Sequence, residues 1–177
     1  MHGTVQLKTN RLLLRKYKME DAETLFRDFG QKAEMSEYSG WNPYETLDMT
    51  KQTIQNFINS YSDPSSYSWV IEYNGMPAGT IGAYDYNKKE NSIELGISIA
   101  MNHWGHGFAS EAASAVIKYL AFDEGSRELR AWCASDNTGS KKVMEKCGMV
   151  LDSTDENALK IGDNVFDKLN FVFRSAD

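Results

Sequence analysis

The sequence predicts an α/β domain with a mixed, twisted sheet and helices on both of its faces. In residues 91–100 every second residue is apolar, which is typical of a strand. Two glycines, Gly105 and Gly107, then break this pattern, and apolar residues recur at helical spacing until Gly125. Residues 127–134 read as a further strand, and a strand–helix–strand unit of this kind places its two strands parallel.

The segments before this unit begin with a strand and two helices. We expect a strand over residues 7–16, then a helix with acidic residues in its first turn that Gly30 ends. Residues 31–46 have no clear period and predict a loop with exposed aromatic side chains. Residues 47–61 have the apolar spacing of a second helix.

A hairpin leads into the central strand, and one helix with two strands completes the chain. Strands over residues 67–73 and 77–86 flank the hairpin signal Asn74-Gly75, and Gly79 and Gly82 in the second strand mark a bulge or a close approach. After residue 134, Asn137 can cap a helix that Gly148 ends. The last two strands are expected at residues 149–153 and 164–173.

Length and composition favour one globular domain over residues 1–177, with its core at about 7–174. Hydrophobic residues make up 41% of the chain and aromatic residues 12%, which excludes disorder. No apolar run reaches the ~18–20 residues of a membrane span, and the N-terminus has no apolar signal core. Cys133 and Cys147 lie in apolar contexts, so we expect buried thiols and a reducing cytoplasm.

The net charge of −6 argues against general nucleic-acid binding, because that function needs a basic face. It fits a cationic substrate better. The alternative is that the 25 acidic residues only keep the chain soluble, and charge alone does not decide between the two.

Glycines at a strand-to-helix turn have a specific chemical use. Gly105 and Gly107 let the backbone N–H groups at a helix N-terminus reach an anion, most often a phosphate. A tight turn without a ligand would have the same sequence. The turn alone is therefore weak evidence for a phosphate site.

Residues 10–15, 104–112 and 136–149 follow one another along the chain as three motifs that resemble those of the GNAT N-acetyltransferase superfamily, in the form of its RimJ/RimL-like branch. Residues 104–112 (WGHGFASEA) are similar to the family's acetyl-CoA pyrophosphate loop. Residues 136–149 resemble its Asn-containing helix, which ends in a Lys-x-Gly-Phe turn. Residues 10–15 (NRLLLR), followed by Glu20-Asp21-Ala22, resemble its first segment.

The resemblance implies a sheet that splays at its central parallel strands, with acetyl-CoA bound as a co-substrate in the opening and no metal. A backbone N–H near Ile97 would hold the oxygen of the tetrahedral intermediate. The residues that the resemblance assigns to acetyl-CoA are Ile97, Ile99, Trp104, Gly105, His106, Gly107, Phe108, Ala109, Ser110, Asn137 and Ser140.

Glu94 is the candidate general base. An amine with a pKa near ~10.4 is almost fully protonated at neutral pH, so a base or a water path must remove its proton. Glu94 lies opposite the isoleucine row of the central strand, and Gly96 beside it leaves room for substrate. The alternative is that Glu94 only pairs with a cation of a neighbouring strand or binds substrate without taking a proton.

The leaving thiolate has to take up a proton, and the sequence has no tyrosine at the position where relatives supply the general acid. Many relatives place a Tyr four residues before the helix-ending glycine, where this chain has Met144. Ser140 or water would have to substitute, or the thiolate leaves unassisted.

His103 and His106 are three residues apart, but they lie in the glycine turn without a third ligand, so no metal site is expected. Ser110 and Glu111 read as a solvated first helical turn.

The acceptor is expected to be a primary amine that enters beside Tyr38 and Trp41, although Trp41 could instead pin its loop to the core. A protein or peptide N-terminus of the ribosomal-protein type is favoured. Polyamines, amino sugars and antibiotics remain alternatives, and so do an acyl-CoA sensor without catalysis and a nucleotide-binding module. No nucleic-acid or membrane partner is expected, and the chain could be a monomer or a homodimer.

Overall fold

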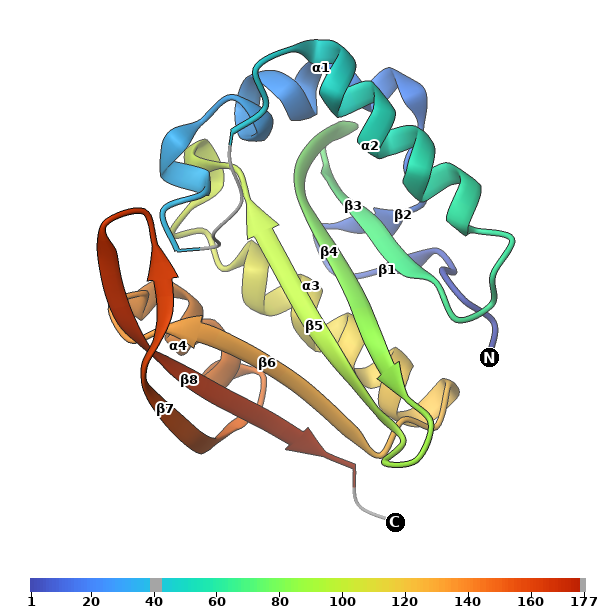
Figure 1. Cartoon of the computed structure of the whole chain (residues 1–177). Helices are drawn as coiled ribbons and strands as arrows, with labels where there is room; N and C mark the ends of the chain where they lie inside the picture. Colours follow the sequence, from blue (N-terminus) through green and yellow to red (C-terminus); the bar gives the residue numbers. More distant parts are fainter. Residues whose placement is uncertain (39–42, 176–177) are drawn as a thin grey trace.

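The computed structural model describes residues 1–38 and 43–175, and its centre is an eight-stranded sheet (Figure 1). The strands lie in the order β1-β2-β3-β4-β5-β6-β8-β7. Only β5 and β6 are parallel to each other; every other neighbouring pair among these strands is antiparallel. Their bounds are β1 (Leu7–Lys8), β2 (Leu13–Arg15), β3 (Tyr67–Tyr73), β4 (Met76–Asn87), β5 (Ser92–Ile99), β6 (Glu128–Ala134), β7 (Val150–Ile161) and β8 (Asn164–Arg174).

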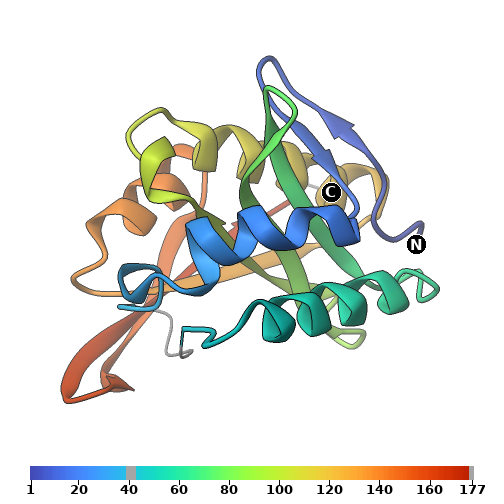
Figure 2. The ribbon, with the colours of Figure 1, turned by 90° about the horizontal axis from the view of Figure 1, so that it is seen from above.

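Helices cover both faces of the sheet, as Figure 2 shows from above. On one face lie α1 (Ala22–Leu25), which continues as a π-helical turn to Gly30, and α2 (Leu47–Ser60). On the other lie α3 (Phe108–Lys118), which continues as a π-helical turn to Asp123, and α4 (Thr138–Lys146). This confirms the predicted mixed α/β architecture. None of the described helices is both long and apolar enough to cross a membrane.

The alternation of β3 shows how the sheet separates two cores. Trp69 and Ile71 point to the larger core, which contains Val116 and Leu120 from the α3 side. Val70 points to the smaller core with α1 and α2. All three β3 residues are fully buried, so β3 is covered on both faces, as a central strand must be when helices pack on each side.

The parallel strands β5 and β6 pair only at one end. Their register joins Ser92 to Glu128, Ile93 to Leu129 and Glu94 to Arg130, and no later pair follows. Beyond this point β5 stays paired with β4 and β6 with β8, so the two central strands separate. The predicted opening in the middle of the sheet is therefore confirmed.

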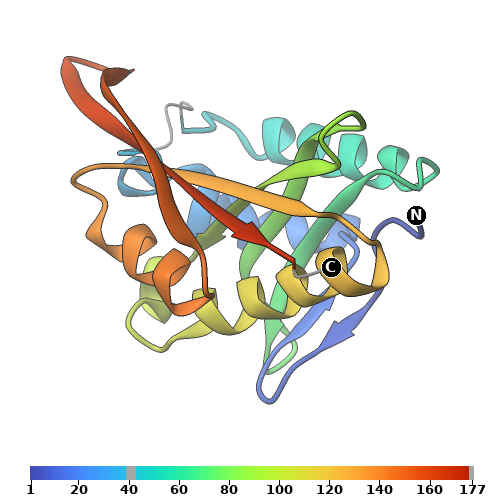
Figure 3. The same ribbon diagram turned by 90° about the horizontal axis from the view of Figure 1, so that it is seen from below.

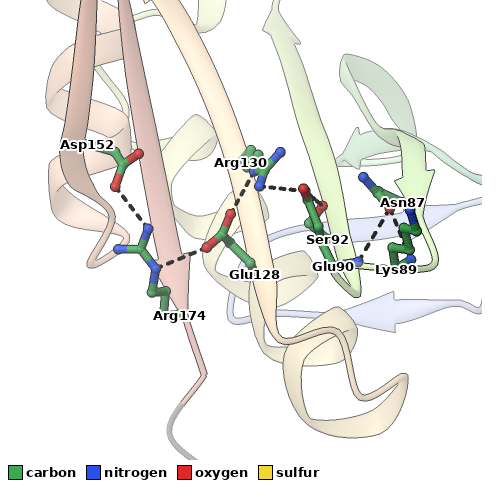
Figure 4. Close-up of polar contacts among 8 residues, drawn as sticks. All are labelled: Asn87, Lys89, Glu90, Ser92, Glu128, Arg130, Asp152 and Arg174. Carbon is green, nitrogen blue, oxygen red and sulfur yellow. Dashed lines mark hydrogen bonds and ion pairs between the residues drawn. The ribbon is translucent and has the colours of Figure 1, made fainter.

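A chain of ion pairs crosses the sheet where β5 and β6 are joined (Figure 4). Arg174 of β8 binds Asp152 of β7 and Glu128 of β6, and Arg130 of β6 binds both Glu128 and Glu90, just before β5. Each exposed pair contributes little by itself, because water and salt screen the charges. Because the pairs are linked, they fix four neighbouring segments at the closed end of the opening.

The first strand was predicted wrongly as one continuous strand over residues 7–16. The chain folds back between β1 and β2, which pair with each other antiparallel. Thr9 makes the turn: its backbone N–H donates to the Leu12 carbonyl, and its hydroxyl oxygen accepts from the Leu12 N–H. A Thr side chain that bonds nearby backbone groups competes in this way with a continuing strand.

The strand predicted at residues 149–153 is longer than expected, since β7 runs to Ile161. Its residues are almost all exposed, so no apolar alternation marks them. Pairing with β8 holds the strand across two register shifts, and Asn157, at a positive φ, donates its N–H to Asp167. The β7–β8 hairpin extends beyond the rest of the sheet, as Figure 3 shows.

Cys133 and Cys147 are free thiols, Cys133 buried and Cys147 half-buried.

Glu124, just after α3, anchors the N-terminus to the core. Its buried carboxylate accepts hydrogen bonds from the Tyr67 and Tyr119 hydroxyls and from the backbone N–H of His2. Burial alone would raise the pKa of Glu124, but these hydrogen bonds outweigh it and lower the pKa below its ordinary value. The carboxylate therefore stabilises the fold in its charged form.

Replacing Glu124 with glutamine should lower the free energy of unfolding by about 2 kcal/mol at neutral pH, because the amide replaces an ionised acceptor. Since the folded-state pKa is depressed, this stabilisation is full above the carboxyl's ordinary pKa of ~4.3 and is lost as the pH falls toward the folded-state value. Urea unfolding at several pH values measures the difference. The exposed Glu156→Gln variant is the control. A loss that stayed constant into acid would contradict the assignment.

Candidate functional site

The gap between β5 and β6 opens into a cleft of about 1370 Å³. Its lining comes from both faces of the sheet. Ala109 and Ser110 of α3 and Ser140 of α4 line it on one side, and Tyr17 and Tyr84 line it on the other. The cleft therefore passes through the sheet, and two ligands could meet in it from opposite faces.

The predicted glycine turn lies at the N-terminus of α3. Gly105 and Gly107 have φ angles of 77° and 78°, which favour glycine over other residues. No side chain caps α3, whereas Thr46 caps α2 and Asn137 caps α4. The first backbone N–H groups of α3 are therefore left for another acceptor, and a phosphate fits this arrangement.

Arg11, in the turn between β1 and β2, braces the glycine turn. Its guanidinium donates to the His106 carbonyl over 3.0 Å, lies 4.8 Å from the centre of the Phe108 ring and pairs with Glu111. Glu111 also accepts from the Thr9 hydroxyl. Burial would raise the pKa of Glu111, but the bonds from Thr9 and Arg11 lower it. The prediction of a solvated first turn was thus wrong for Glu111, which ties the β1–β2 turn to α3.

Most of the residues assigned to acetyl-CoA line the cleft, and His106 does not. The His106 ring lies 2.9 Å from the Trp104 carbonyl oxygen through Nδ1. Trp104 donates its indole N–H to the Ile99 carbonyl at the end of β5. The Phe108 ring is buried beside Tyr73, so its backbone N–H rather than its ring is placed to meet a ligand.

The helix α4 lines the cleft on the same face of the sheet as α3. The Asn137 side chain accepts from the Ser140 N–H over 3.0 Å, so Asn137 caps α4 as predicted. Ser140 lines the cleft, and its hydroxyl has no hydrogen-bond partner in the part of the chain that the structure describes. Met144 is buried in the larger core. Cys133 also lines the cleft, and burial raises the pKa of its thiol to about 11.

Glu94 lies on the face of β5 opposite α3, beside the cleft but outside its lining. Its carboxylate accepts the Trp132 indole N–H over 2.9 Å. Arg130 is its register partner on β6, but the Arg130 guanidinium binds Glu90 and Glu128 instead. Among the described residues Glu94 forms no ion pair. It is held by a neutral donor.

Tyr84 occupies the space that Gly96 was expected to leave for substrate. A Cβ at Gly96 would lie 2.7 Å from the Tyr84 hydroxyl oxygen, so glycine is needed for the ring to lie there. Burial, together with the charge of Glu94, raises the pKa of Tyr84 to about 12. Tyr84 pairs with Glu94 in the β4–β5 register, but the register shifts between Tyr84 and Asn87. Counting back from the turn would therefore have placed Asp85, and not Tyr84, opposite Glu94.

The mouth on this face combines aromatic and acidic side chains. The half-buried Tyr38 contacts Phe166 of β8 edge-to-face, with ring centres 5.6 Å apart. Glu34, Glu37 and Asp136 also line the cleft. Trp41 lies outside the described residues. Tyr38 lines the cleft, and its contact with the acceptor stays a prediction.

The two histidines of the turn, His103 and His106, do not form a metal site with other described side chains. His103 packs its ring against Tyr73 and Phe108. Within residues 1–38 and 43–175, no group of three or more His, Cys, Asp or Glu side chains is arranged to hold a metal ion.

Comparisons with known proteins agree with the fold and with the sequence motifs. Residues 11–150 match the family model described as an acetyltransferase (GNAT) domain. The uncharacterised N-acetyltransferase YoaA of Bacillus subtilis is 33% identical over 144 residues, which is 80% of this chain and 81% of that protein.

Two solved structures show the same fold. A ribosomal-protein-S5-alanine acetyltransferase of Vibrio fischeri has a TM-score of 0.87 at 17% identity and covers 98% of each chain. A RimL ribosomal L7/L12 alpha-N-protein acetyltransferase, solved with coenzyme A, has a TM-score of 0.88 at 17% identity and covers 96% of this chain and 98% of its own.

Proposed function

The chain belongs to the GNAT acetyltransferase family, and we propose that it transfers the acetyl group of acetyl-CoA directly to the N-terminal amine of a protein or peptide, as in the RimJ/RimL-like branch. The observation that carries the proposal is a helix N-terminus, uncapped by any side chain, at one end of a cleft that passes through the sheet. A phosphate-bearing donor and an amine acceptor could enter this cleft from opposite faces.

The residues of the glycine turn before α3 fit acetyl-CoA, the acetyl donor. The N–H groups at the start of α3 would bind its pyrophosphate, and Gly105 and Gly107 would let these phosphates approach the backbone. Arg11 would hold the turn in place through the His106 carbonyl. Acetyl-CoA, when bound, supplies the thioester that the amine attacks.

Glu94 would act on the acceptor. A carboxylate without a cationic partner is free to accept a proton, directly or through water, and the Trp132 N–H fixes one of its oxygens. Ser140, in the cleft wall, is the candidate that would protonate the leaving sulfur. The N–H near Ile97 would hold the developing negative charge, because β6 no longer pairs with that part of β5.

The acceptor itself is inferred from the mouth and from relatives. The names of two solved neighbours assign them ribosomal-protein acceptors. Tyr38 and Phe166 supply an aromatic wall that could contact the first side chains of a peptide. Glu34, Glu37 and Asp136 favour a second candidate, a small cationic amine such as a polyamine, since they place negative charge around the mouth.

An acyl-CoA sensor without catalysis would need no base. It would be favoured by a Glu94 neutralised in a salt bridge, but the described residues place no cation against this carboxylate. The free carboxylate therefore supports an enzyme.

An assay of CoA release, with peptides beginning with Ala or Ser beside spermidine, tests the acceptor. We expect peptides to be turned over with little dependence on salt, since aromatic contacts are not screened. Spermidine, drawn by exposed acids, should show a KM that rises steeply with salt, because charges are screened beyond ~8–10 Å at physiological ionic strength. Turnover of spermidine alone would show that the acceptor is a polyamine and not a peptide. No CoA release with any amine would refute catalysis.

A further inference from the structure

Lys168, on β8, carries a primary amine at the acceptor side of the cleft. Its Nζ lies 5.2 Å from the centre of the Trp132 ring, and Trp132 lines the cleft. Asp155 stands opposite Lys168 in the β7–β8 register and Asp167 precedes it, yet in the described part of the chain Lys168 forms no ion pair. An indole rather than a carboxylate is therefore the neighbour of this ammonium.

The same indole connects Lys168 to Glu94. The Trp132 N–H donates to Glu94, while the Trp132 ring faces the Lys168 ammonium. Three strands, β5, β6 and β8, thus bring a carboxylate, an indole and a primary amine together. This is the set of groups that an acceptor amine needs: a surface that attracts its cationic form and a base that can take its proton.

The sheet register places Lys168 at the level of the open part of β5. The last parallel pair is Glu94 with Arg130, so the continued register would set Gly96 level with Trp132 and Ser98 level with Ala134. Lys168 pairs with Ala134. Its side chain therefore belongs at the height of Ile97 and Ser98, both of which line the cleft.

We propose that Lys168 is an acetyl acceptor in this protein's own site, so that the enzyme acetylates itself at this residue. The inference rests on the proposed acetyl transfer. Lys168 is half-buried on a hairpin at the free edge of the sheet, where a long side chain can swing from the indole into the gap.

The step balances without a further reactant. The Lys168 ammonium gives up a proton, for which Glu94 or water is the acceptor, and the neutral Nζ attacks the thioester carbon. A nitrogen–carbon bond forms and the carbon–sulfur bond breaks. The nitrogen loses its second proton as it becomes the amide, and the leaving thiolate takes up this proton, directly or through water. The acetylated side chain has no charge, so it no longer makes a cation–π contact with the Trp132 ring.

Mass spectrometry of the full chain, incubated with acetyl-CoA and no other amine, tests the proposal. We expect one acetyl group at Lys168, formed about tenfold or more faster than at Lys160, because a positioned amine beside a base reacts faster than a free one. Lys160 is exposed on β7 of the same hairpin and serves as the internal control for chemical acetylation. The rate per chain should not change with protein concentration, since the reaction is intramolecular.

A second measurement needs no acetyl-CoA. The indole N–H resonance of Trp132, identified with Trp132→Phe, should shift in Lys168→Met and stay in place in Lys160→Met. An unmoved resonance would overturn the contact on which the proposal rests.

The outcomes separate this proposal from the proposed function. Equal acetylation of Lys168 and Lys160, while peptides or amines are turned over, would overturn self-acetylation and leave the transferase standing. A rate per chain that rises with protein concentration would show transfer between chains and overturn the intramolecular step. Acetylation of Lys168 without turnover of any added amine would uphold the inference and refute the proposed acceptor. Absence of all transfer would refute both.

Discussion

Replacing Gly107 with alanine should weaken acetyl-CoA binding about tenfold or more, equivalent to ~1.4 kcal/mol or more. The new Cβ would stand on the residue whose backbone precedes the uncapped N–H groups of α3, where a phosphate has to come close. Gly107 also has a φ of 78°, so a side chain strains the turn by ~1 kcal/mol. Calorimetric titration with acetyl-CoA measures the affinity.

A matched control separates the backbone strain that alanine causes at a positive φ from the lost contact between the turn and the phosphate. Gly125, beyond the other end of the same helical segment, has a φ of 74°, and a Cβ there would meet no atom within 4 Å. We expect Gly107→Ala and Gly125→Ala to lower the free energy of unfolding by similar amounts, since both force alanine into a left-handed conformation. Only Gly107→Ala should lose affinity. Equal affinity in the two folded variants would remove the pyrophosphate assignment.

The two elements on either side of Gly107 show which parts of the fold a sequence pattern can predict. The alternation of residues 91–100 and the helical spacing that follows predicted β5 and α3, because both elements bury one regular face in the same core. The turn between them was visible for the same reason. Local periodicity therefore predicted the scaffold of the site, and the resemblance supplied its expected ligand.

Contacts that depend on side chains from distant segments were not predictable in this way. Arg11 braces the glycine turn only because Thr9 folds the chain back between β1 and β2, and the polar residues there read equally well as the start of a strand. Tyr84 fills the space over Gly96 because of the antiparallel register of β4 and β5. These positions follow from pairing between strands, which periodicity within one strand does not encode.

Trp132 illustrates the same limit at the centre of the site. In the sequence it is one polar-face position of a short strand. Its role as a hydrogen-bond donor to Glu94 requires that β6 diverge from β5 just after Arg130, since only then does the indole lie at the edge of the gap. The splay converts an ordinary sheet position into part of a candidate active site.

Replacing Glu94 with glutamine should lower kcat/KM at neutral pH by about 10²–10³-fold, since a positioned base typically contributes that much. At high pH the acceptor amine, with a pKa near ~10.4, loses its proton without help, so the variant should recover a large part of the lost activity. Steady-state CoA release from pH 6 to 10 measures both effects. An unchanged pH profile would leave Glu94 without a role as base.

Two further variants make this prediction specific. Glu90→Gln removes a carboxylate from the closed end of the same strand pair, so it controls for a general loss of negative charge. Its kcat/KM should stay within a few-fold of the unmodified enzyme. Trp132→Phe keeps an aromatic ring but removes the indole N–H, so the Glu94 carboxylate loses the donor that orients it. We expect Trp132→Phe to lower kcat about tenfold with a retained pH profile, because the base remains but is less well positioned. A pH profile of Trp132→Phe that matches Glu94→Gln would contradict this expectation, because it would show that the carboxylate cannot act as a base without the indole N–H.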